Sequence, residues 1–252
     1  MTSEVRIYSI AVCPFAQRTR MLLQLKNVAF ELIEIDITRP RPQWFLALNP
    51  LGQVPVIEHR GRVLNESSVI NEYLDEEFPQ LRVMPDDAYQ RAQSRVLIDR
   101  VNHGFVPAMY QLLMNQDTDR LAAARDRALA EWAWLERFLT RHNPDGAWLW
   151  DRLGMADLSI APFFQRWCLN AWYRYVEAPS GEDYARVRRW YDACLAHPLV
   201  AGTGMPDEDY IKLYEDYALG YGNGAVPAGR ARSSFDLSVP LNARPMPPRG
   251  RP

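Results

Sequence analysis

The most constraining feature of the chain is a cysteine and a proline set between a strand pattern and a helix pattern. Residues 5–10 are β-prone, Cys13 and Pro14 follow, and apolar residues then recur at helical spacing up to residue 25. A second run, residues 30–37, has the apolar density of a buried strand flanked by helices. Strand, helix and strand in this order predict a parallel βαβ unit.

Two shorter strand patterns complete a first domain. Residues 54–58 and 62–65 flank a turn at Arg60-Gly61 and predict an antiparallel hairpin. Ser67 can then cap a helix whose apolar residues recur up to Phe78. A βαβ unit followed by ββα is the arrangement of a thioredoxin-like fold, so we expect an α/β domain of this kind over residues 1–80.

The chain changes character after this domain. Residues 79–87 contain two prolines and little periodicity, which is typical of an interdomain linker. Long helical patterns follow and predict an all-helical domain over residues 88–221; they cover residues 89–115, 120–141, 156–172, 183–195 and 207–219. Residues 222–252 are rich in Pro, Gly and Arg, which predicts a tail without regular structure, either lying across the body of the protein or loose.

Charge and composition limit the class of partner. The chain has 252 residues, of which 48% are hydrophobic, and a formal net charge of -2. A nucleic-acid-binding protein would carry a clustered basic excess, so we expect a small molecule or a protein as partner and no nucleic acid. The four histidines are scattered without the spacing of metal ligands, and we expect no metal site.

Cysteine usage and hydropathy indicate the compartment. The three cysteines Cys13, Cys168 and Cys194 are far apart and odd in number, which does not suit the disulfide framework of a secreted protein. No segment is apolar over the length of a membrane span, and the first residues show no signal-peptide pattern. We therefore expect a cytoplasmic protein without a membrane partner.

Cys13 is the candidate catalytic residue. A thiol at a helix N-terminus lies near unpaired N–H groups and the positive end of the helix dipole, Pro14 suits the first helical turn, and Arg18 and Arg20 add positive charge, so we expect a raised thiolate fraction. Ala16 stands where a dithiol motif would place its resolving cysteine, so the chemistry requires an external thiol. The alternative is a buried structural cysteine, but the strand-Cys-Pro-helix setting favours the catalytic role.

Residues 13–18, CPFAQR, resemble the signature of omega-class glutathione transferases. The resemblance continues in the same order through residues 39–45, 49–56 and 66–74, and so covers the first domain. Residues 212–217, 222–230 and 244–249 resemble the C-terminal region of the bacterial glutathione lyases of lignin β-aryl-ether degradation. The resemblance implies a glutathione transferase type of helical domain, glutathione as co-substrate and a homodimer.

The resemblance also implies contacts to glutathione in the first domain. Val54 and Pro55 would form a cis-proline loop, in which the backbone of Val54 pairs with the cysteinyl part of the tripeptide. Glu66 and Ser67, at a helix start, would hold the ammonium and the carboxylate of the γ-glutamyl end. Taken singly, Val54-Pro55 could simply begin an edge strand, and Glu66-Ser67 could be only a helix cap.

Three further residues receive roles from the resemblance. Arg41 stands where omega-class members commonly have a lysine for the glycyl end, although it could also be a solvated charge. Phe15 would add a backbone contact beside the sulfur. Tyr217, in the helical domain, would donate a hydrogen bond to a substrate ketone or a proton to the leaving carbanion. Most other aromatic residues of that domain are expected to be core.

Three functions are compatible with these residues. The first is a lyase that removes glutathione from α-glutathionyl aryl ketones, the thioethers derived from lignin, through a mixed disulfide of Cys13 and glutathione. The second is a general omega-class reductase of dehydroascorbate or glutathionylated proteins. The third is a non-enzymatic binding protein with the glutathione transferase fold, similar to the omega-like chloride channel group. The tail resemblance favours the first.

Overall fold

The computed structural model describes residues 5–250 and contains one four-stranded sheet in the order β2-β1-β3-β4. β1 (Val5–Ser9) pairs in parallel with β2 (Phe30–Glu34) and antiparallel with β3 (Val56–His59). β3 also pairs antiparallel with β4 (Arg62–Asn65). The predicted sequence of a βαβ unit and a ββα unit is confirmed.

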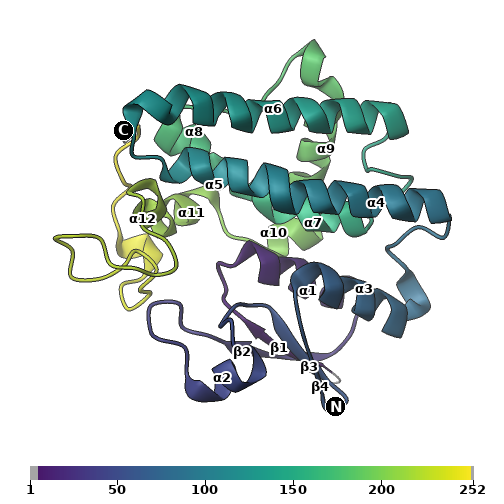
Figure 1. Ribbon diagram of the computed structural model, residues 1–252, viewed down its shortest axis with the longest axis horizontal. Coiled ribbons are helices and arrows are strands. Elements are labelled where there is room, and N and C mark those ends of the chain that lie inside the picture. Colours follow the sequence, from purple (N-terminus) through teal and green to yellow (C-terminus); the bar gives the residue numbers. More distant parts are fainter. Residues whose placement is uncertain (1–4, 251–252) are drawn as a thin grey trace.

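Helices cover both sides of this sheet (Figure 1). α1 (Pro14–Leu25) and α3 (Ser67–Glu77) lie between the sheet and the helical domain. Ile7 is fully buried beneath them and belongs to the same core as residues of both helices. α2 (Gln43–Leu48), which no sequence pattern predicts, lies on the opposite side of the sheet.

β2 differs from its prediction as a buried strand. It is the edge strand of the sheet, it ends at Glu34, and Leu32 in its middle is 49% exposed. An apolar run shows that a segment is a strand, but its position in the sheet depends on partners elsewhere in the chain. The hairpin turn is as predicted: Arg60 and Gly61 have φ of 50° and 72°, the left-handed values that a tight hairpin turn requires.

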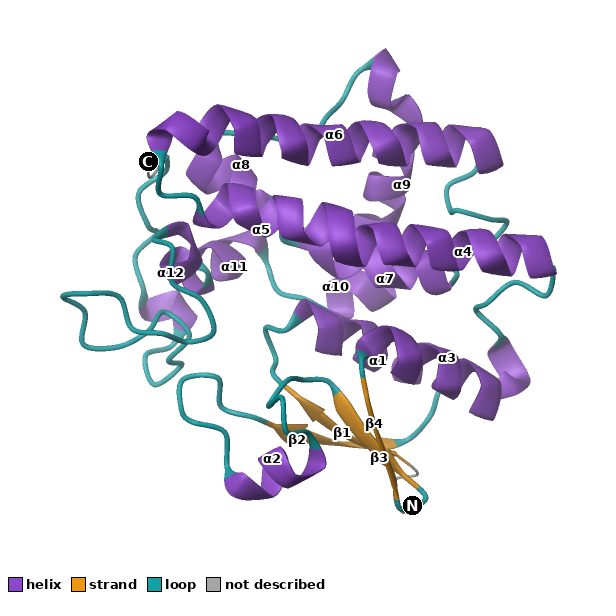
Figure 2. Ribbon diagram, in the orientation of Figure 1, coloured by secondary structure: helices purple, strands orange, loops and turns teal. Residues whose placement is uncertain are grey.

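The second part of the chain is helical, as expected (Figure 2). Its longer helices are α4 (Ala88–Arg100), α5 (Val106–Met114), α6 (Thr118–His142), α7 (Met155–Gln165) and α9 (Ala185–Ala196). Shorter helices are α8 (Cys168–Arg174), α10 (Pro198–Thr203), α11 (Asp207–Leu213) and α12 (Glu215–Ala218). Single 3-10 turns occur at η1 (Pro79–Leu81), η3 (Glu182–Tyr184) and η4 (Leu241–Ala243). Within residues 5–250, no helix combines the length and the apolar character needed to cross a bilayer.

Three of the predicted helices are interrupted in the structure. The 89–115 helix contains a π-helical turn, η2 (Val101–Phe105), just before Pro107, which has no N–H to give to a regular ladder. The 156–172 helix divides between α7 and α8 at Arg166 and Trp167, and the 207–219 helix divides at Tyr214. Both breaks bring polar side chains toward the first domain. Helix α10 was not predicted.

The tail lies across the body of the protein over its described part. It leaves α12, passes the first domain and returns to α8, where the N–H of Gly250 donates to the carbonyl of Trp172 at 3.0 Å. Ser233 and Phe235 are buried. The predicted domain limits include residues 1–4 and 251–252, which lie outside the described residues, and we keep the division into residues 1–80, 88–221 and 222–252 as a proposal.

Candidate active site

A cavity of about 880 Å³ lies between the first domain, the helical domain and the tail. Its walls come from loops of the first domain, from the end of the helical domain and from tail residues such as Phe235. All the side chains expected at the site contribute to it, namely Cys13, Phe15, Arg41, Val54, Pro55, Glu66, Ser67 and Tyr217. Residues from Ile10 to Phe235, 225 positions apart in sequence, therefore share one cavity.

Cys13 occupies the position that the sequence predicts. It is the N-cap residue of α1, with extended backbone at φ -74° and ψ 118°, and Pro14 is the first helical residue. The thiol Sγ donates to the carbonyl of Val54 at 3.8 Å. The backbone N–H groups of Phe15 and Ala16 point at the sulfur and lower the pKa of the thiol. The backbone of Phe15 therefore lies beside the Cys13 sulfur, and its contact with glutathione stays a prediction.

The pKa of the Cys13 thiol is raised, whereas the sequence predicts that it is lowered. Protein atoms crowd the sulfur, and burial raises the pKa of the thiol by more than the two N–H groups and the charges of Arg166 and Arg20 lower it. The predicted rise in thiolate fraction is wrong, because a helix start can be seen in sequence but the burial of the sulfur cannot. The reactivity of Cys13 should consequently increase with pH.

Arg166 lies beneath Cys13, and no motif of the sequence marks it. Its side chain is fully buried and donates from Nη2 to the carbonyl of Val12 at 2.8 Å. Nη1 donates to Gln17 Oε1 at 2.9 Å, and Nε to Tyr214 Oη at 3.2 Å. None of the acceptors that the structure describes for this guanidinium is a carboxylate, and its positive charge lowers the pKa of the Cys13 thiol. A charged residue inside the apolar run 158–169 is the signal that could have found it.

Arg18 and Arg20 are both buried, but they serve different parts of the site. Arg20 donates to Ser9 Oγ at 2.5 Å and to the carbonyl of Ala11 at 3.0 Å, and so holds the loop before Cys13. Arg18 turns toward the helical domain, where its guanidinium lies 5.0 Å from the ring centre of Phe15. It also donates to Ser67 Oγ at 3.3 Å and to the carbonyl of Ser159 at 2.6 Å. Their charges are therefore structural as well as electrostatic.

Gln17 extends the polar contact between the two domains. It is fully buried on α1 and donates from Nε2 to Gln165 Oε1 at 2.7 Å, while its Oε1 accepts from Arg166. Successive residues of the catalytic helix, Gln17 and Arg18, thus bind polar groups of α7. The helix that carries Cys13 is fixed by the second domain.

Glu66 and Ser67 begin α3 at the far end of the cavity. Glu66 is the N-cap residue and has φ 65° and ψ 107°, a backbone conformation that is rare for a side chain of this type and is often found at ligand-binding positions. The prediction that Ser67 caps this helix is wrong, because Ser67 is the first helical residue and its Oγ accepts from Arg18. With that lone pair used, the Ser67 hydroxyl hydrogen can be donated to an anion in the cavity.

The Val54-Pro55 peptide bond is cis, and the segment precedes β3 at the cavity wall. Arg41 also reaches this wall. It donates from Nη1 to the carbonyl of Asp36 at 2.8 Å and from Nε to the carbonyl of Gly52 at 3.1 Å. Arg41 therefore fixes the loop before α2 and is more than a solvated charge; its contact with the glycyl end of glutathione stays a prediction.

Tyr217 stands opposite the first-domain residues, in an aromatic group with Tyr110, Tyr214 and Phe235. Its ring lies 5.7 Å from that of Tyr110, 5.1 Å from that of Tyr214 and 5.6 Å from that of Phe235, measured between ring centres. Burial raises the pKa of the Tyr217 hydroxyl, and the nearby charge of Cys13 raises it further. The hydroxyl therefore stays protonated at neutral pH. Phe235 was missed at the sequence level, where it is one apolar residue in a polar tail.

No set of three or more His, Cys, Asp and Glu side chains within residues 5–250 is arranged to hold a metal ion. The polar groups of the cavity suit a peptide-like anion better. Backbone groups at Val54, the start of α3 and the Arg41 loop offer donors and acceptors along one wall.

The chain is similar in sequence to known glutathione transferases. Residues 12–77 match the family model described as the N-terminal domain of glutathione S-transferase. The chain is 30% identical over 234 residues to a probable glutathione transferase omega-2 of Caenorhabditis elegans, across 87% of this chain and 88% of that protein. It is 33% identical over 218 residues to glutathione S-transferase omega-1 of Rattus norvegicus, across 84% of this chain and 86% of that protein.

A solved structure supports the glutathione transferase fold. A rice glutathione transferase determined in complex with glutathione has a TM-score of 0.74 and 27% identity, covering 87% of this chain and 98% of that chain. The relatives span both domains, and the residues expected to hold glutathione line one cavity with Cys13. The chain therefore belongs to the omega-class glutathione transferases.

Proposed function

We propose that the protein is a glutathione-dependent thiol transferase that removes glutathione from α-glutathionyl aryl ketones, such as lignin-derived thioethers, through a mixed disulfide of Cys13 and glutathione. The observation that carries the proposal is one cavity that holds Cys13, the expected glutathione contacts and an aromatic wall. Any thiol chemistry with glutathione requires both the cysteine and the residues that bind glutathione beside it. The aromatic wall supports an aryl group on the second substrate.

Glutathione would lie along the first-domain wall of the cavity. Its γ-glutamyl end would contact Glu66 and Ser67, its cysteinyl backbone would pair with Val54, and its glycyl carboxylate would reach Arg41. Phe15 would add its backbone N–H beside the sulfur. This placement puts the glutathionyl sulfur of a thioether next to Cys13 and its carbon substituent toward the helical domain.

The reaction balances with glutathione as the only reductant. The Cys13 thiolate attacks the sulfur of the thioether, a Cys13–glutathione disulfide forms, and the carbon–sulfur bond breaks with its electron pair moving to the carbon as an enolate. Protonation of the enolate gives the ketone. A second glutathione thiolate attacks the mixed disulfide and releases glutathione disulfide and the Cys13 thiolate.

Tyr217 would act on the ketone oxygen or on the enolate. The raised pKa of its hydroxyl keeps the proton available, and the Tyr217 ring lies in the aromatic group that lines the cavity. A hydrogen bond to an oxygen that gains negative charge is stronger in the transition state than in the ground state. Arg166 would stabilise the other anion of the reaction, the Cys13 thiolate, at each turnover.

The test uses S-phenacylglutathione, the thioether of glutathione and acetophenone. The expected result is release of acetophenone with one glutathione disulfide per ketone, and a mixed disulfide on Cys13 by intact-mass spectrometry when the second glutathione is withheld. Cys13→Ser should abolish both, and Cys168→Ser, a cysteine outside the cavity lining, should change neither. Undiminished ketone release by Cys13→Ser would overturn the mechanism.

A second candidate is the general omega-class reductase, which acts on dehydroascorbate or glutathionylated proteins. It is favoured by the omega-class relatives and by the fact that the first-domain wall alone would serve it. The ratio of turnover on the phenacyl thioether to turnover on a small glutathione mixed disulfide separates the two candidates. A protein that never forms a Cys13 adduct would instead be a binding protein with this fold.

The setting of the protein also belongs to the proposal. We infer that it works in the cytoplasm, where glutathione is kept reduced. We also infer that it is a homodimer, a state that is common among glutathione transferases. Size-exclusion chromatography with light scattering tests the dimer, and fractionation of cells tests the compartment. Neither result changes the chemistry proposed for Cys13.

A further inference from the structure

We infer that Phe235, which the tail carries into the cavity, determines specificity by selecting a flat aromatic group on the second substrate; this inference rests on the proposed function. Phe235 is 5% exposed and lines the same cavity as Cys13 and Tyr217. It comes from the tail and not from the helical domain that supplies the neighbouring tyrosines.

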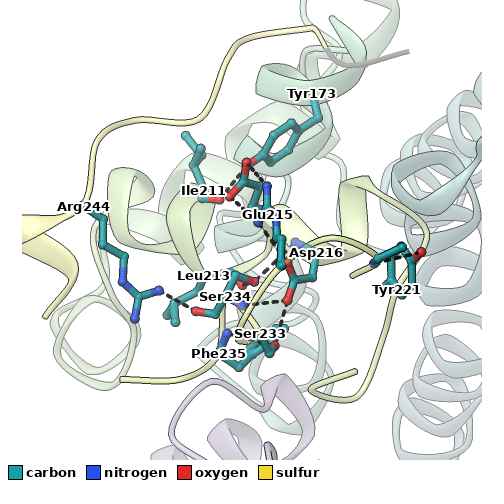
Figure 3. Close-up of polar contacts among 12 residues, drawn as sticks. Tyr173, Ile211, Leu213, Glu215, Asp216, Tyr221, Ser233, Ser234, Phe235 and Arg244 are labelled. Carbon is teal, nitrogen blue, oxygen red and sulfur yellow. Dashed lines mark hydrogen bonds and ion pairs between the residues drawn. The ribbon is translucent and has the colours of Figure 1, made fainter. Parts of the chain in front are cut away.

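The residues before Phe235 are held by one buried carboxylate (Figure 3). Asp216 accepts a hydrogen bond from Ser233 Oγ at 2.7 Å and from the N–H of Ser234 at 2.6 Å. Ser234 Oγ donates to the carbonyl of Leu213 at 2.5 Å. Asp216 also pairs with Arg230 at 3.3 Å. The tail is therefore fixed to α11 and α12 by polar contacts that lie away from solvent.

Arg244 holds the residues on both sides of Phe235. Arg244 donates from Nη1 to the carbonyl of Ser234 at 2.5 Å and from Nη2 to the carbonyls of Asp236 and Val239. Since Ser234 and Asp236 flank Phe235, its backbone is restrained on both sides. A side chain that is held before the ligand arrives loses little entropy on binding, which is what a specificity residue requires.

The ring of Phe235 meets its neighbours edge to face. It lies 5.2 Å from the ring of Tyr214 at an interplanar angle of 74°, and 5.6 Å from the ring of Tyr217 at 66°. Rings arranged in this way form the walls of a slot, and an aryl group can add an edge-to-face or offset contact to them. An alkyl group of similar length would gain only its buried area.

The tail also contacts the first domain, at Gly224, and so covers one side of the cavity that holds Phe235. A Cβ at Gly224 would lie 2.3 Å from the carbonyl oxygen of Ile37, so only glycine fits where the tail passes the loop after β2. Its φ of 76° likewise favours glycine. Ile37 and Asn223 line the cavity with Phe235. The tail thus bridges the two domains at the mouth of the site that holds Phe235.

The test measures equilibrium binding in a Cys13→Ser background, where no mixed disulfide can form. Isothermal titration calorimetry gives the Kd of S-phenacylglutathione and of S-acetonylglutathione, which differ in an aryl and a methyl group on the ketone. Phe235→Ala should reduce the preference for the phenacyl compound by about tenfold, the size of one aromatic contact with its buried area. Phe235→Leu, which keeps most of the volume, should reduce it by several-fold.

Two controls keep the result interpretable. Leu237→Ala changes an exposed side chain two residues further along the tail and should leave the preference unchanged. The Kd of glutathione itself should be the same in all variants, which shows that the first-domain wall is intact. An unchanged preference in both Phe235 variants would overturn the inference.

The inference and the proposed function fail in different ways. If the protein with Cys13 releases no acetophenone but the Phe235 variants lose the aryl preference, the proposed reaction is wrong and the role of Phe235 stands. If acetophenone is released and the preference is independent of Phe235, the reaction stands and the inference falls.

Discussion

The charge of Arg166 beneath Cys13 leads to a prediction about reactivity. Replacing Arg166 with methionine keeps the length and apolar stem of the side chain and removes its charge. Arg166 reaches the carbonyl of Val12, the residue next to Cys13. At an effective dielectric constant of about 20, two unit charges in such neighbouring positions interact by about 2 to 4 kcal/mol. Each 1.4 kcal/mol is about a factor of ten, so the thiolate of Cys13 should be at least about tenfold less populated in Arg166→Met at a given pH near neutrality.

The assay follows alkylation of Cys13 by iodoacetamide, which reacts with the thiolate only. Because burial raises the pKa of Cys13, the rate in both proteins should rise with pH between pH 7 and 9, about tenfold per unit. At each pH, the alkylation rate of Arg166→Met should be about tenfold lower than that of the native protein, and the rate of Arg166→Lys should lie between the two. A lysine keeps the charge but cannot make the same fork of hydrogen bonds.

A second buried arginine provides the matched control. Arg174 also donates to main-chain carbonyls, those of Leu113 and Ala218, but its charge is not among the causes that shift the pKa of Cys13. Arg174→Met should lower the free energy of unfolding without changing the rate of Cys13 alkylation at any pH. Urea unfolding measures the loss in both variants. Equal alkylation rates for native protein and Arg166→Met across this pH range would refute the electrostatic role of Arg166.

Three further outcomes are expected. Asp157 is buried and accepts from the N–H groups of Leu149 and Gly154 and from the indole of Trp190. Asp157→Ala leaves these donors unsatisfied and should lower the free energy of unfolding, measured in urea, by about 3 kcal/mol. A loss below about 1 kcal/mol would contradict this count of unsatisfied donors. Tyr217→Phe should lower kcat for the phenacyl thioether by about ten- to a hundredfold with little change in KM, and an unchanged kcat would remove the tyrosine from the mechanism. Glu66→Gln should raise KM for glutathione about tenfold, and an equal KM would show that the ammonium of glutathione binds elsewhere.

The parts of the fold that follow from local signals could be predicted. Cys13 and Pro14 mark the start of a helix, and Arg60 and Gly61 mark a hairpin turn, because each pattern depends on neighbours in sequence. β2 was expected as a buried strand and lies at the edge of the sheet, since its place is set by pairing with residues far along the chain. The same limit applies to the cysteine: its helix position is local, whereas its burial is not.

The missing members of the site come from distant segments. Arg166 lies more than 150 residues after Cys13 in the chain and reaches it only because α7 ends against α1. Phe235 enters the cavity because Asp216 and Arg244 hold the tail on both sides of it. Neither contact leaves a periodic pattern in the sequence. An isolated charge in an apolar run and an isolated aromatic in a polar tail are the available clues.

The polar contacts of α1 have a consequence for how such a protein can evolve. Gln17 and Arg18 are buried on the catalytic helix and find their partners in the second domain, at Gln165 and Ser159. A first domain recombined with a foreign helical domain would carry these two polar side chains against surfaces that were never selected to receive them. The two halves of the gene should therefore have diverged together, and chimaeras with related enzymes should need the α7 segment exchanged along with α1.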